Sequence, residues 1–282
     1  MLEALKRMSN EKVSVVISTH NRRDLLRRSL DSVIKQTYSN IEIIVSDDFS
    51  DYDVQALLVE YKYVTNFPII YRRNIRNMGA CYTRNQGIAL ATGAYVTGLD
   101  DDDEFTSARV QTLVDNYDEK LAFVTTNTFI MSNSGGKKMF RTTKKKVINF
   151  DNLLWENVIG TQVLTSLEKI KSVGGFDESL DSGQDVDLWL RLVQEYGLAL
   201  RLPICGYILH TEHEKKRISS SEKKIKGWEA VYLKYAKYRT PSQLTYCKLK
   251  IGNFGNNIKF YISLLKTFDL QIYFYLVKRI YR

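Results

Sequence analysis

The chain has 282 residues, of which 44% are hydrophobic and 26% are charged, so it can bury a sizeable core and is not intrinsically disordered. Its three cysteines are far apart and form no CxxC pair, which argues against a disulfide framework or a zinc knuckle and suits a reducing cytoplasm. The formal net charge is +9, but residues 215–282 carry 16 Lys and Arg against 3 Asp and Glu. Residues 1–214 therefore have a net charge of −4, and we expect the two parts to face different partners.

No targeting or membrane-spanning segment is predicted. The first eight residues lack the apolar core of a signal peptide, and the longest late apolar run, Tyr273 to Val277, is too short to span a bilayer. We therefore expect a cytoplasmic protein, for which peripheral contact with the inner face of the cell membrane remains open.

The first predicted elements alternate between strand and helix. Val13 to Thr19 is a β-branched run typical of a buried parallel strand, and the apolar residues from Leu25 to Ile34 recur at helical spacing. We expect Asp24 to cap this helix. A second strand, Ile41 to Ser46, is followed by the acidic pair Asp47-Asp48.

The alternation continues along the chain. We expect a helix from Val54 to Tyr63, a strand from Pro68 to Arg72, and a helix from Ala80 to Ala91 that Thr92-Gly93 closes as a glycine C-cap. Ala94 to Leu99 is predicted to be a fourth strand. Polar residues follow these strands, which is the layout of an open α/β sheet whose ligands bind at the carboxyl ends.

Four consecutive aspartates, Asp100 to Asp103, follow the fourth strand. Adjacent carboxylates repel one another, so a folded chain keeps them together only when solvent or a bound cation screens the repulsion. The run alone therefore leaves two interpretations open, a divalent metal site or a solvated acidic turn. No glycine lies between Val13 and Met78, so the dinucleotide-binding fingerprint is missing, which disfavours cofactor-dependent oxidoreduction.

Six short motifs occur in a characteristic order. They are VSVVISTHNR at 13–22, IVSDDFS at 44–50, Asn77-x-Gly79 with Arg84-Asn85-x-Gly87, LDDDD at 99–103, GGFD at 174–177 and GQDVDLWLR at 183–191. In this order and at these spacings they resemble the family 2 glycosyltransferases, whose nucleotide-sugar-binding α/β fold is called GT-A. The likeness covers about Val13 to Ser221.

The resemblance implies a fold and a division of the chain. We expect a Rossmann-like mixed sheet flanked by helices over residues 1–215, with a nucleotide-sugar half at about 12–103 and an acceptor and base half at about 104–215. Residues 216–282 lie outside the likeness and are predicted to form a basic, tyrosine-rich helical extension.

The resemblance also implies a metal site of the DxD type. In the family this element binds Mn²⁺ or Mg²⁺, which neutralises the leaving diphosphate. We assign the metal to Asp102, with Asp100 or Asp101 contacting the ribose or the donor sugar, and the four-residue run leaves this register open by one position. A downstream histidine often completes such a site, so His210 or His213 is a candidate ligand, with a structural role as the alternative.

Further residues are implied to bind the nucleotide sugar. They are Ser18, Thr19, Asn21, Asp47, Asp48, Arg84, Asp100 and Asp101. Ser18, Thr19 and Asp48, with Asp47 beside it, would recognise the nucleobase, although a turn or a cap before the helix at Val54 is the alternative for Asp47-Asp48. Asn21 and Arg22 would fix their loop or reach a phosphate, and Arg84 would orient the diphosphate or lie on the surface.

Asp185 aligns with the catalytic aspartate of the family. It lies in the first turn of a predicted helix, where the helix dipole stabilises a carboxylate, and it would deprotonate the acceptor hydroxyl. Without the family, Asp185 and Asp187 would be interpreted as ordinary N-terminal helix acids. The family usually has Glu where this chain has Gln184, which removes one charge beside the base.

The extension combines lysines with tyrosines, a composition typical of nucleic-acid-binding or membrane-surface segments. Two stripes predict amphipathic helices that could lie on an anionic membrane: Phe260, Leu264 and Phe268, then Ile272, Tyr275 and Arg279. A helical cap on the catalytic domain with a solvated basic face is the alternative.

The predicted function is that of an inverting, metal-dependent glycosyltransferase. It would move a UDP-linked hexose or N-acetylhexosamine to a hydroxyl of a glycan or polyprenyl-diphosphate-linked saccharide, in bacterial O-antigen, capsule or exopolysaccharide synthesis. A homo-oligomer is compatible with the sequence, and no nucleic acid is expected. Two other functions are the alternatives: a metal-dependent phosphohydrolase, for which the first strand offers no nucleophilic Asp, and a basic nucleic-acid-binding protein, which leaves the acidic half unexplained.

Overall fold

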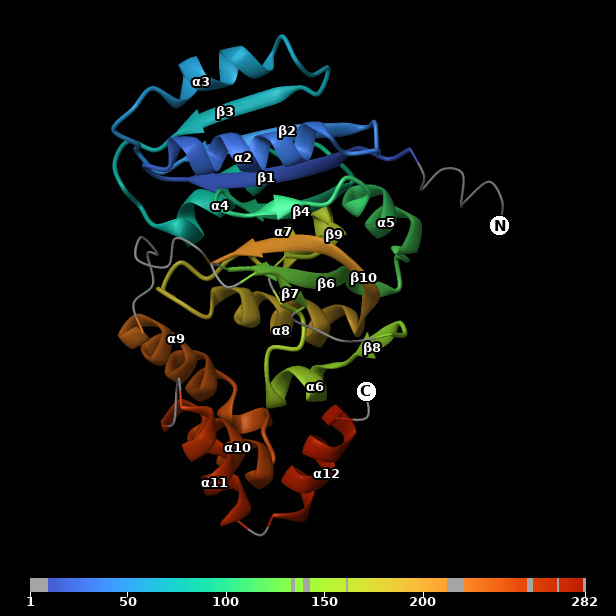
Figure 1. Cartoon of the computed structure of the whole chain (residues 1–282), viewed down its shortest axis with the longest axis vertical. Helices are drawn as coiled ribbons and strands as arrows, with labels where there is room; N and C mark the ends of the chain where they lie inside the picture. Colours follow the sequence, from blue (N-terminus) through green and yellow to red (C-terminus); the bar gives the residue numbers. More distant parts are fainter. Residues whose placement is uncertain are drawn as a thin grey trace.

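The computed structural model describes residues 10–132, 135–138, 143–160, 162–211, 221–252, 256–267 and 269–280. Within these residues, ten strands form one mixed sheet with helices on both faces, and more helices continue from one end (Figure 1). The strands are β1 (Val13–Thr19), β2 (Ile41–Asp47), β3 (Ile69–Arg73), β4 (Tyr95–Asp100), β5 (Glu104–Phe105), β6 (Leu121–Met131), β7 (Lys137–Lys138), β8 (Lys146–Ile148), β9 (Leu164–Ser166) and β10 (Leu198–His210). The helices are α2 (Arg23–Ile34), α3 (Val54–Tyr61), α4 (Ala80–Leu90), α5 (Arg109–Asn116), α6 (Phe150–Trp155), α7 (Leu167–Ser172), α8 (Gln184–Tyr196), α9 (Ser221–Lys234), η2 (Ala236–Tyr238), α10 (Pro241–Gly252), α11 (Asn257–Leu265) and α12 (Leu270–Ile280).

The strand order is β3-β2-β1-β4-β9-β6-β10-β5, with β7 beside β6 and β8 beside β10. The strands β3, β2, β1 and β4 are parallel, whereas β9 runs antiparallel to both β4 and β6. At the last paired positions Thr19 lies opposite Asp47, and Ser18 lies opposite Asp100. The carboxyl ends of β1, β2 and β4 therefore meet at one edge of the sheet, which confirms the predicted mixed α/β architecture.

The apolar runs in these strands are unbroken because both faces of the sheet are covered. Val16 of β1 packs into a cluster with Ile88 of α4 and Trp189 of α8. Its neighbours Val15 and Ile17 face the other way, into a second cluster to which α2, α3 and α5 contribute. A strand buried on both faces needs apolar residues at consecutive positions, which explains the β-branched run in the sequence.

Two local predictions are wrong. The N-cap residue of α2 is Arg22, and Asp24 lies inside the first turn, where no side-chain capping hydrogen bond is made. The helix α4 ends at an extended C-cap residue, Ala91, so Gly93 is not a left-handed cap. Gly93 is needed for space instead, because a Cβ atom there would lie 2.6 Å from the carbonyl oxygen of Lys12.

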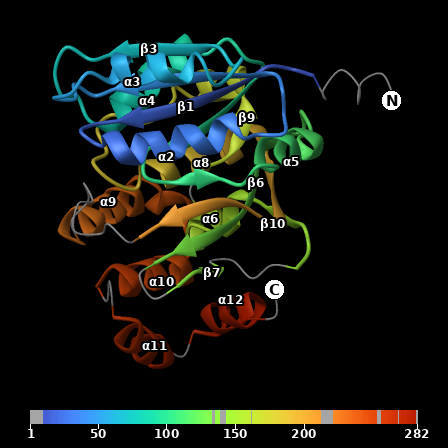
Figure 2. The same ribbon diagram turned by 45° about the horizontal axis from the view of Figure 1, so that its top comes forward.

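The C-terminal helices divide between two clusters. Val231 of α9 and the following Tyr235 belong to the same cluster as Trp189 of α8. A smaller cluster, formed with Trp155 of α6, contains Tyr246, Cys247, Phe260, Leu264 and Ile272. Two views place α11 and α12 at the end of the molecule opposite β3 (Figure 1 and Figure 2). The domain boundary expected at residue 215 falls within 212–220, outside the described residues, and stays a prediction.

In the part of the chain that the structure describes, none of the helices has the length and apolar character needed to cross a bilayer.

Candidate active site

The carboxyl ends of β1, β2 and β4 open into a cavity of about 430 Å³. Most of the predicted site residues line it, namely Ser18, Thr19, Asp48, Arg84, Asp100, Asp101, Asp102 and Asp185. These residues come from five separate segments of the sequence, which the parallel strands and α8 bring to one place. The lining is strongly acidic, so a bound anion such as a diphosphate would need cationic compensation there.

The first three residues of the aspartate run pair with side chains from other segments of the chain. Asp100 Oδ1 lies 2.8 Å from the Arg84 guanidinium. Asp101 accepts a hydrogen bond of 2.8 Å from the Thr19 hydroxyl, and Arg22 bridges Asp101 and Asp102 at 2.9 and 3.0 Å. Asp101 is only 5% exposed, so the alternative of a solvated acidic turn does not describe this segment.

Asp103 is turned into the protein. Its carboxylate accepts hydrogen bonds of 2.8 Å from the Tyr207 hydroxyl and from the backbone N–H of His210, both on β10. The His210 ring Nε2 lies 2.6 Å from Glu104 Oε1, and His210 does not line the cavity. The geometry therefore gives no support to His210 as a metal ligand, because its ring is held by Glu104. His213 lies outside the described residues.

Burial shifts the acid–base behaviour of this run. It raises the pKa of Asp101 to about 6, although the charge of Arg22 opposes the shift. Burial, together with the charges of Asp100 and Asp102, raises the pKa of Asp103 well above its usual range. The pKa values of both Asp101 and Asp103 are thus raised by burial.

Arg84 of α4 lies between two carboxylates. Burial lowers its pKa, but the charges of Asp100 and Asp185 outweigh burial and raise the net pKa. Asp100 also accepts a hydrogen bond of 3.2 Å from Gln162 Nε2. A side chain on Gly98 would collide with Gln162, since a Cβ atom there would lie 2.3 Å from its Oε1. Gly98 therefore lets Gln162 cross β4 and reach the site.

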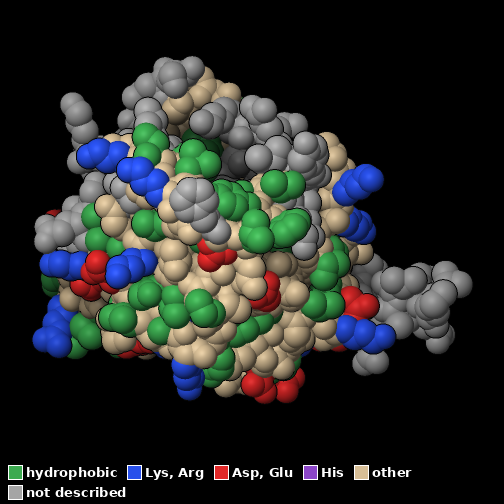
Figure 3. Space-filling view, turned by 90° about the horizontal axis from the view of Figure 1, so that it is seen from below, with side chains coloured by type: hydrophobic (Ala, Val, Ile, Leu, Met, Phe, Trp, Pro, Cys, Tyr) green, Lys and Arg blue, Asp and Glu red, His purple; other side chains and the backbone are tan. Residues whose placement is uncertain are grey.

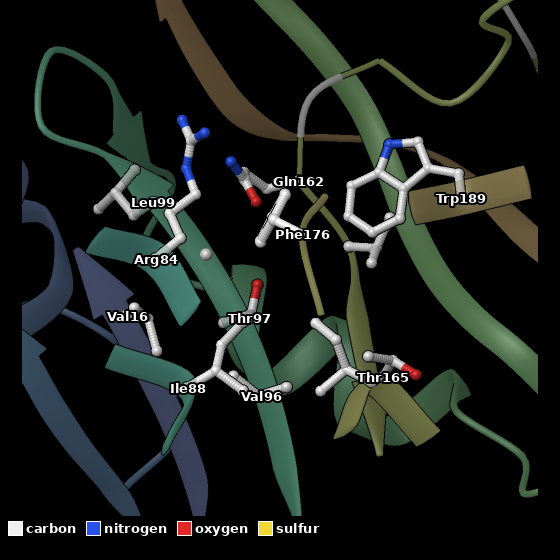
Figure 4. Close-up of a pocket in the computed structure, with 13 residues that line it drawn as sticks. Val16, Arg84, Ile88, Val96, Thr97, Leu99, Gln162, Thr165, Phe176 and Trp189 are labelled. Carbon is white, nitrogen blue, oxygen red and sulfur yellow. The ribbon is translucent and has the colours of Figure 1, made fainter. Parts of the chain in front are cut away.

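A small hollow lies behind this contact. Figure 4 shows Arg84 and Gln162 side by side and Trp189 opposite them. The hollow measures about 20 Å³, enough for about one water molecule. The Thr97 hydroxyl, which lines it, and the Trp189 indole N–H are buried and make no hydrogen bond to any described residue.

Asp185 lies in the first turn of α8, after the left-handed Gly183. Its Oδ1 is buried and accepts no hydrogen bond from any described residue. Burial raises the pKa of Asp185 to about 6, with the charge of Arg84 opposing and that of Asp100 adding to the shift. A carboxylate of this kind beside a cavity is suited to general-base chemistry near neutral pH.

Asp48 lines the cavity but also builds its wall. Its carboxylate accepts hydrogen bonds from Asn74 Nδ2 at 2.9 Å and from the backbone N–H groups of Met78 and Gly79 at 2.7 and 2.9 Å. Gly79 is the N-cap residue of α4, with φ of 88°. Asp48 therefore holds the loop that leads into α4, whereas the N-cap of α3, the helix expected at Val54, is Asp53.

Two predicted binding residues do not line the cavity. Asp47 is fully buried, and it accepts hydrogen bonds from the backbone N–H of Ser50 and the Tyr71 hydroxyl. Asn21 adopts a left-handed φ of 54° and exchanges hydrogen bonds with Asp51. Both side chains are used to build the loops after β1 and β2, so direct contact with a nucleotide is not supported by this geometry.

Several lining residues were not predicted from the sequence. They are His20, Asn77, Thr83, Asp181, Ser182 and Gln184, with Gly79, Ala80, Asp103 and Leu209, whereas Arg22, expected to fix its loop or reach a phosphate, also lines the cavity. His20 Nε2 lies 3.1 Å from Asn77 Nδ2, which links the loop after β1 to the loop before α4. The position of His20 immediately after a strand end was the available signal for this residue.

The carboxylates of this cavity suit a divalent cation only when a bound substrate, such as a diphosphate, supplies further oxygen ligands. Among the described residues, no group of three His, Cys, Asp or Glu side chains is arranged to hold a metal ion. Asp102 lines the cavity with 15% of its side chain exposed. Mg²⁺ is commonly held by one or two carboxylates, substrate phosphates and several waters, so Asp102 is compatible with a cation that a diphosphate completes.

Comparisons with known proteins place this α/β fold and its acidic cavity in a class of sugar-transferring enzymes. The family model described as "Glycosyl transferase family 2" matches residues 14–171. The chain is 35% identical to the putative colanic acid biosynthesis glycosyl transferase WcaA of Escherichia coli (strain K12), over 80% of this chain and 82% of that protein.

Two further proteins are similar over different shares of the chain. A Campylobacter jejuni protein named GalNAc(5)-diNAcBac-PP-undecaprenol beta-1,3-glucosyltransferase is 28% identical over 65% of this chain and 60% of its own length. The crystal structure of S. aureus TarS 1-349 in complex with UDP-GlcNAc superposes with a TM-score of 0.67, at 17% identity, over 92% of this chain and 77% of that chain.

The chain belongs to glycosyltransferase family 2 and has the GT-A fold. It is therefore a glycosyltransferase, as the resemblance implied, and the phosphohydrolase and nucleic-acid-binding alternatives are set aside.

Proposed function

We propose that the enzyme transfers a sugar from a nucleoside diphosphate sugar to an acceptor hydroxyl by a single displacement that inverts the anomeric centre. The observation that carries the proposal is the buried Oδ1 of Asp185, which accepts no hydrogen bond from a described residue and lies beside the cavity that Asp100, Asp101 and Asp102 also line. A base and a diphosphate-binding edge at the same cavity are what this reaction requires.

In the proposed step Asp185 acts as the general base. The acceptor hydroxyl gives its proton to the Asp185 carboxylate while its oxygen attacks the anomeric carbon. The bond from the anomeric carbon to the diphosphate oxygen breaks, and its electron pair leaves with the nucleoside diphosphate. Attack on the face opposite the leaving group makes inversion the outcome.

Asp102 is the proposed holder of Mn²⁺ or Mg²⁺, with Asp100 and Asp101 on the donor side of the cavity. When bound, such a cation neutralises negative charge on the leaving diphosphate. Arg84 adds a fixed positive charge between Asp100 and Asp185, and its Nη1 makes no hydrogen bond to any described residue. That geometry suits Arg84 for orienting the donor.

The proposed donor is a UDP-linked hexose or N-acetylhexosamine, and the proposed acceptor is a glycan or a polyprenyl-diphosphate-linked saccharide. The UDP-GlcNAc in the TarS crystal structure supports the donor class. The name of the Campylobacter jejuni relative supports a lipid-linked acceptor, and that of the Escherichia coli relative supports surface-polysaccharide synthesis. Such an acceptor places the reaction at the inner face of the cell membrane.

A screen of nucleotide sugars for donor hydrolysis and transfer tests the proposal, with Mn²⁺, Mg²⁺ or a chelator present. The full chain is compared with Asp185→Asn and Asp102→Asn, each of which removes one charge with little change in shape. Asp115→Asn, an exposed acid on α5, is the matched control. We expect transfer by the control to equal that of the parent.

We expect Asp185→Asn to lose at least about a hundredfold in transfer rate, as removal of a general base does. Asp102→Asn should weaken binding of the metal and so raise the metal concentration needed for half-maximal transfer. Full transferase activity of Asp185→Asn, or full activity of the parent in chelator, would overturn the mechanism. Retained anomeric configuration in the product would exclude the single displacement.

A further inference from the structure

The outer face of α11 and α12 exposes large apolar side chains. We call this surface the α11–α12 ridge, and its members, between 48% and 70% exposed, are Tyr261, Ile262, Leu265, Leu270, Phe274 and Val277. Leu265 and Leu270, which are 65% and 70% exposed, flank the short connection between the two helices. Exposed apolar side chains gathered on neighbouring helices mark an interaction site more often than scattered ones do.

The ridge is a different surface from the stripes that the sequence indicated. Phe260, Leu264 and Ile272 are buried in the cluster around Trp155, and Tyr275 stacks on the Trp155 ring at 4.3 Å. Phe268 and the side chain of Arg279 lie outside the described residues. The stripe predicted to lie on a membrane is thus the inner face of the two helices where it is described, because packing against α6 uses it.

Charge indicates what covers the ridge. Between residues 256 and 280 the only acidic residue is Asp269, whose carboxylate caps α12 by accepting from the N–H groups of Gln271 and Ile272. Lys259 and Lys266 are exposed beside the ridge, and residues 215–282 carry a net charge of +13. A second copy would set like charge against like charge, whereas an anionic lipid surface complements both the charge and the apolar side chains.

The view from below shows the face to which these helices belong (Figure 3). Hydrophobic side chains lie across the middle of this face with acidic side chains among them, and lysine and arginine side chains lie mainly toward its margins. At a membrane interface, apolar side chains enter the acyl region and basic side chains extend to the headgroups.

We propose that the α11–α12 ridge docks the enzyme on an anionic lipid surface. Leu265, Leu270 and Phe274 enter the headgroup–acyl boundary, and the lysines around them contact anionic headgroups. The proposal goes beyond the glycosyl transfer itself, because it concerns a surface separate from the cavity. If the acceptor is lipid-linked, docking raises its local concentration at the cavity.

Co-sedimentation of the full chain with vesicles tests the proposal. One set of vesicles contains phosphatidylglycerol and phosphatidylethanolamine, and the other contains only phosphatidylcholine. The variant Leu265→Asp/Phe274→Asp places two charges on the ridge. The matched control Tyr63→Asp/Val64→Asp makes two similar changes at apolar side chains that are 86% and 64% exposed on the loop after α3, far from the ridge along the sheet (Figure 1).

We expect the parent and the control to sediment with the anionic vesicles and the ridge variant to bind at least about tenfold more weakly. Added salt should weaken binding, and zwitterionic vesicles should bind much less of the protein. Donor hydrolysis in solution should be unchanged in the ridge variant, so failure of docking is distinguishable from failure of the proposed reaction.

Equal sedimentation of the ridge variant and the parent would overturn the proposal, as would the absence of binding to anionic vesicles. A dimer of the parent that the ridge substitutions convert to a monomer, without vesicle binding, would assign the ridge to self-association instead.

Discussion

The Lys234 ammonium at the end of α9 lies 2.6 Å from Oδ1 of Asp187, so the extension is ion-paired to the helix that carries the proposed base. Asp187 is fully buried and also contacts the Arg191 guanidinium at 2.8 Å and the Tyr235 hydroxyl at 3.0 Å. Lys234 reaches Asp177 as well, at 2.7 Å. The first helix of the extension is therefore part of the support of α8.

Replacing Lys234 by Met should lower the free energy of unfolding by about 1 kcal/mol. The buried Asp187 carboxylate would lose one of its cationic partners while Arg191 and Tyr235 remain, and Lys234 is 37% exposed, so solvent already weakens the pair. Urea unfolding of the full chain measures the change. Lys237→Met, an exposed neighbour, is the control and should be neutral. Equal stability of both variants would mean that the pair contributes nothing.

Substitution of Gly227 tests whether the close packing of α9 against the start of α8 positions the proposed base. A Cβ atom on Gly227 would lie 2.4 Å from the carbonyl oxygen of Ser182, in the loop that leads into α8. We expect Gly227→Ala to displace this loop and the first turn of α8, and to lower kcat by about 10- to 100-fold, because small misplacement of a reacting group is costly.

Gly252→Ala is the matched control, since an added Cβ atom there would meet nothing within 4 Å. Circular dichroism and unfolding of both variants separate misplacement from misfolding. A folded Gly227→Ala enzyme with the parent's kcat would show that α9 does not position the base.

The sequence was sufficient for the first four strands but not for the roles of neighbouring identical residues. The predicted bounds of β1 coincide with Val13–Thr19, because a strand covered on both faces is apolar throughout and its end is polar. Asp102 and Asp103 are indistinguishable in the sequence. They differ because the Asp103 carboxylate accepts hydrogen bonds from the Tyr207 hydroxyl and the His210 backbone, about a hundred residues away, whereas the Asp102 carboxylate pairs with Arg22.

The same limit applies to the loops and the extension. Asn21 and Asp47 occupy strand ends, where binding residues are expected, but local hydrogen bonds to Asp51 and Ser50 use their side chains. In α11 and α12 apolar residues lie on both faces, so periodicity alone could not indicate which face packs on Trp155.

The raised pKa of Asp185 predicts how its replacement affects stability at different pH. Burial moves the pKa from its ordinary 3.8 to about 6, so between these values the folded chain holds a proton that the unfolded chain has lost. The contribution of this group to stability is therefore lost as pH rises through that window. Asp185→Asn cannot ionise, so it should gain about 1–2 kcal/mol relative to the parent between pH 4 and pH 7.

Urea unfolding of both proteins at the two pH values measures the gain, with the exposed Asp115→Asn as the control that should show none. A pH-independent difference between Asp185→Asn and the parent would contradict an acid whose pKa is raised by burial.

The rate of transfer should rise with pH through about 6, because the proposed base accepts a proton only when Asp185 is ionised. The charge of Arg84 holds this pKa down against burial and against the charge of Asp100. Arg84→Met should therefore move the acid limb of the pH–rate profile upward, by about one unit.

The profile is measured at saturating donor, so that weaker donor binding does not distort it. Arg27→Met is the control, because Arg27 pairs with Glu60 on the surface and does not line the cavity. A limb that stays at the parent's pH in Arg84→Met, with activity retained, would show that the limb belongs to another group, and a flat profile in the parent would exclude Asp185 as the base.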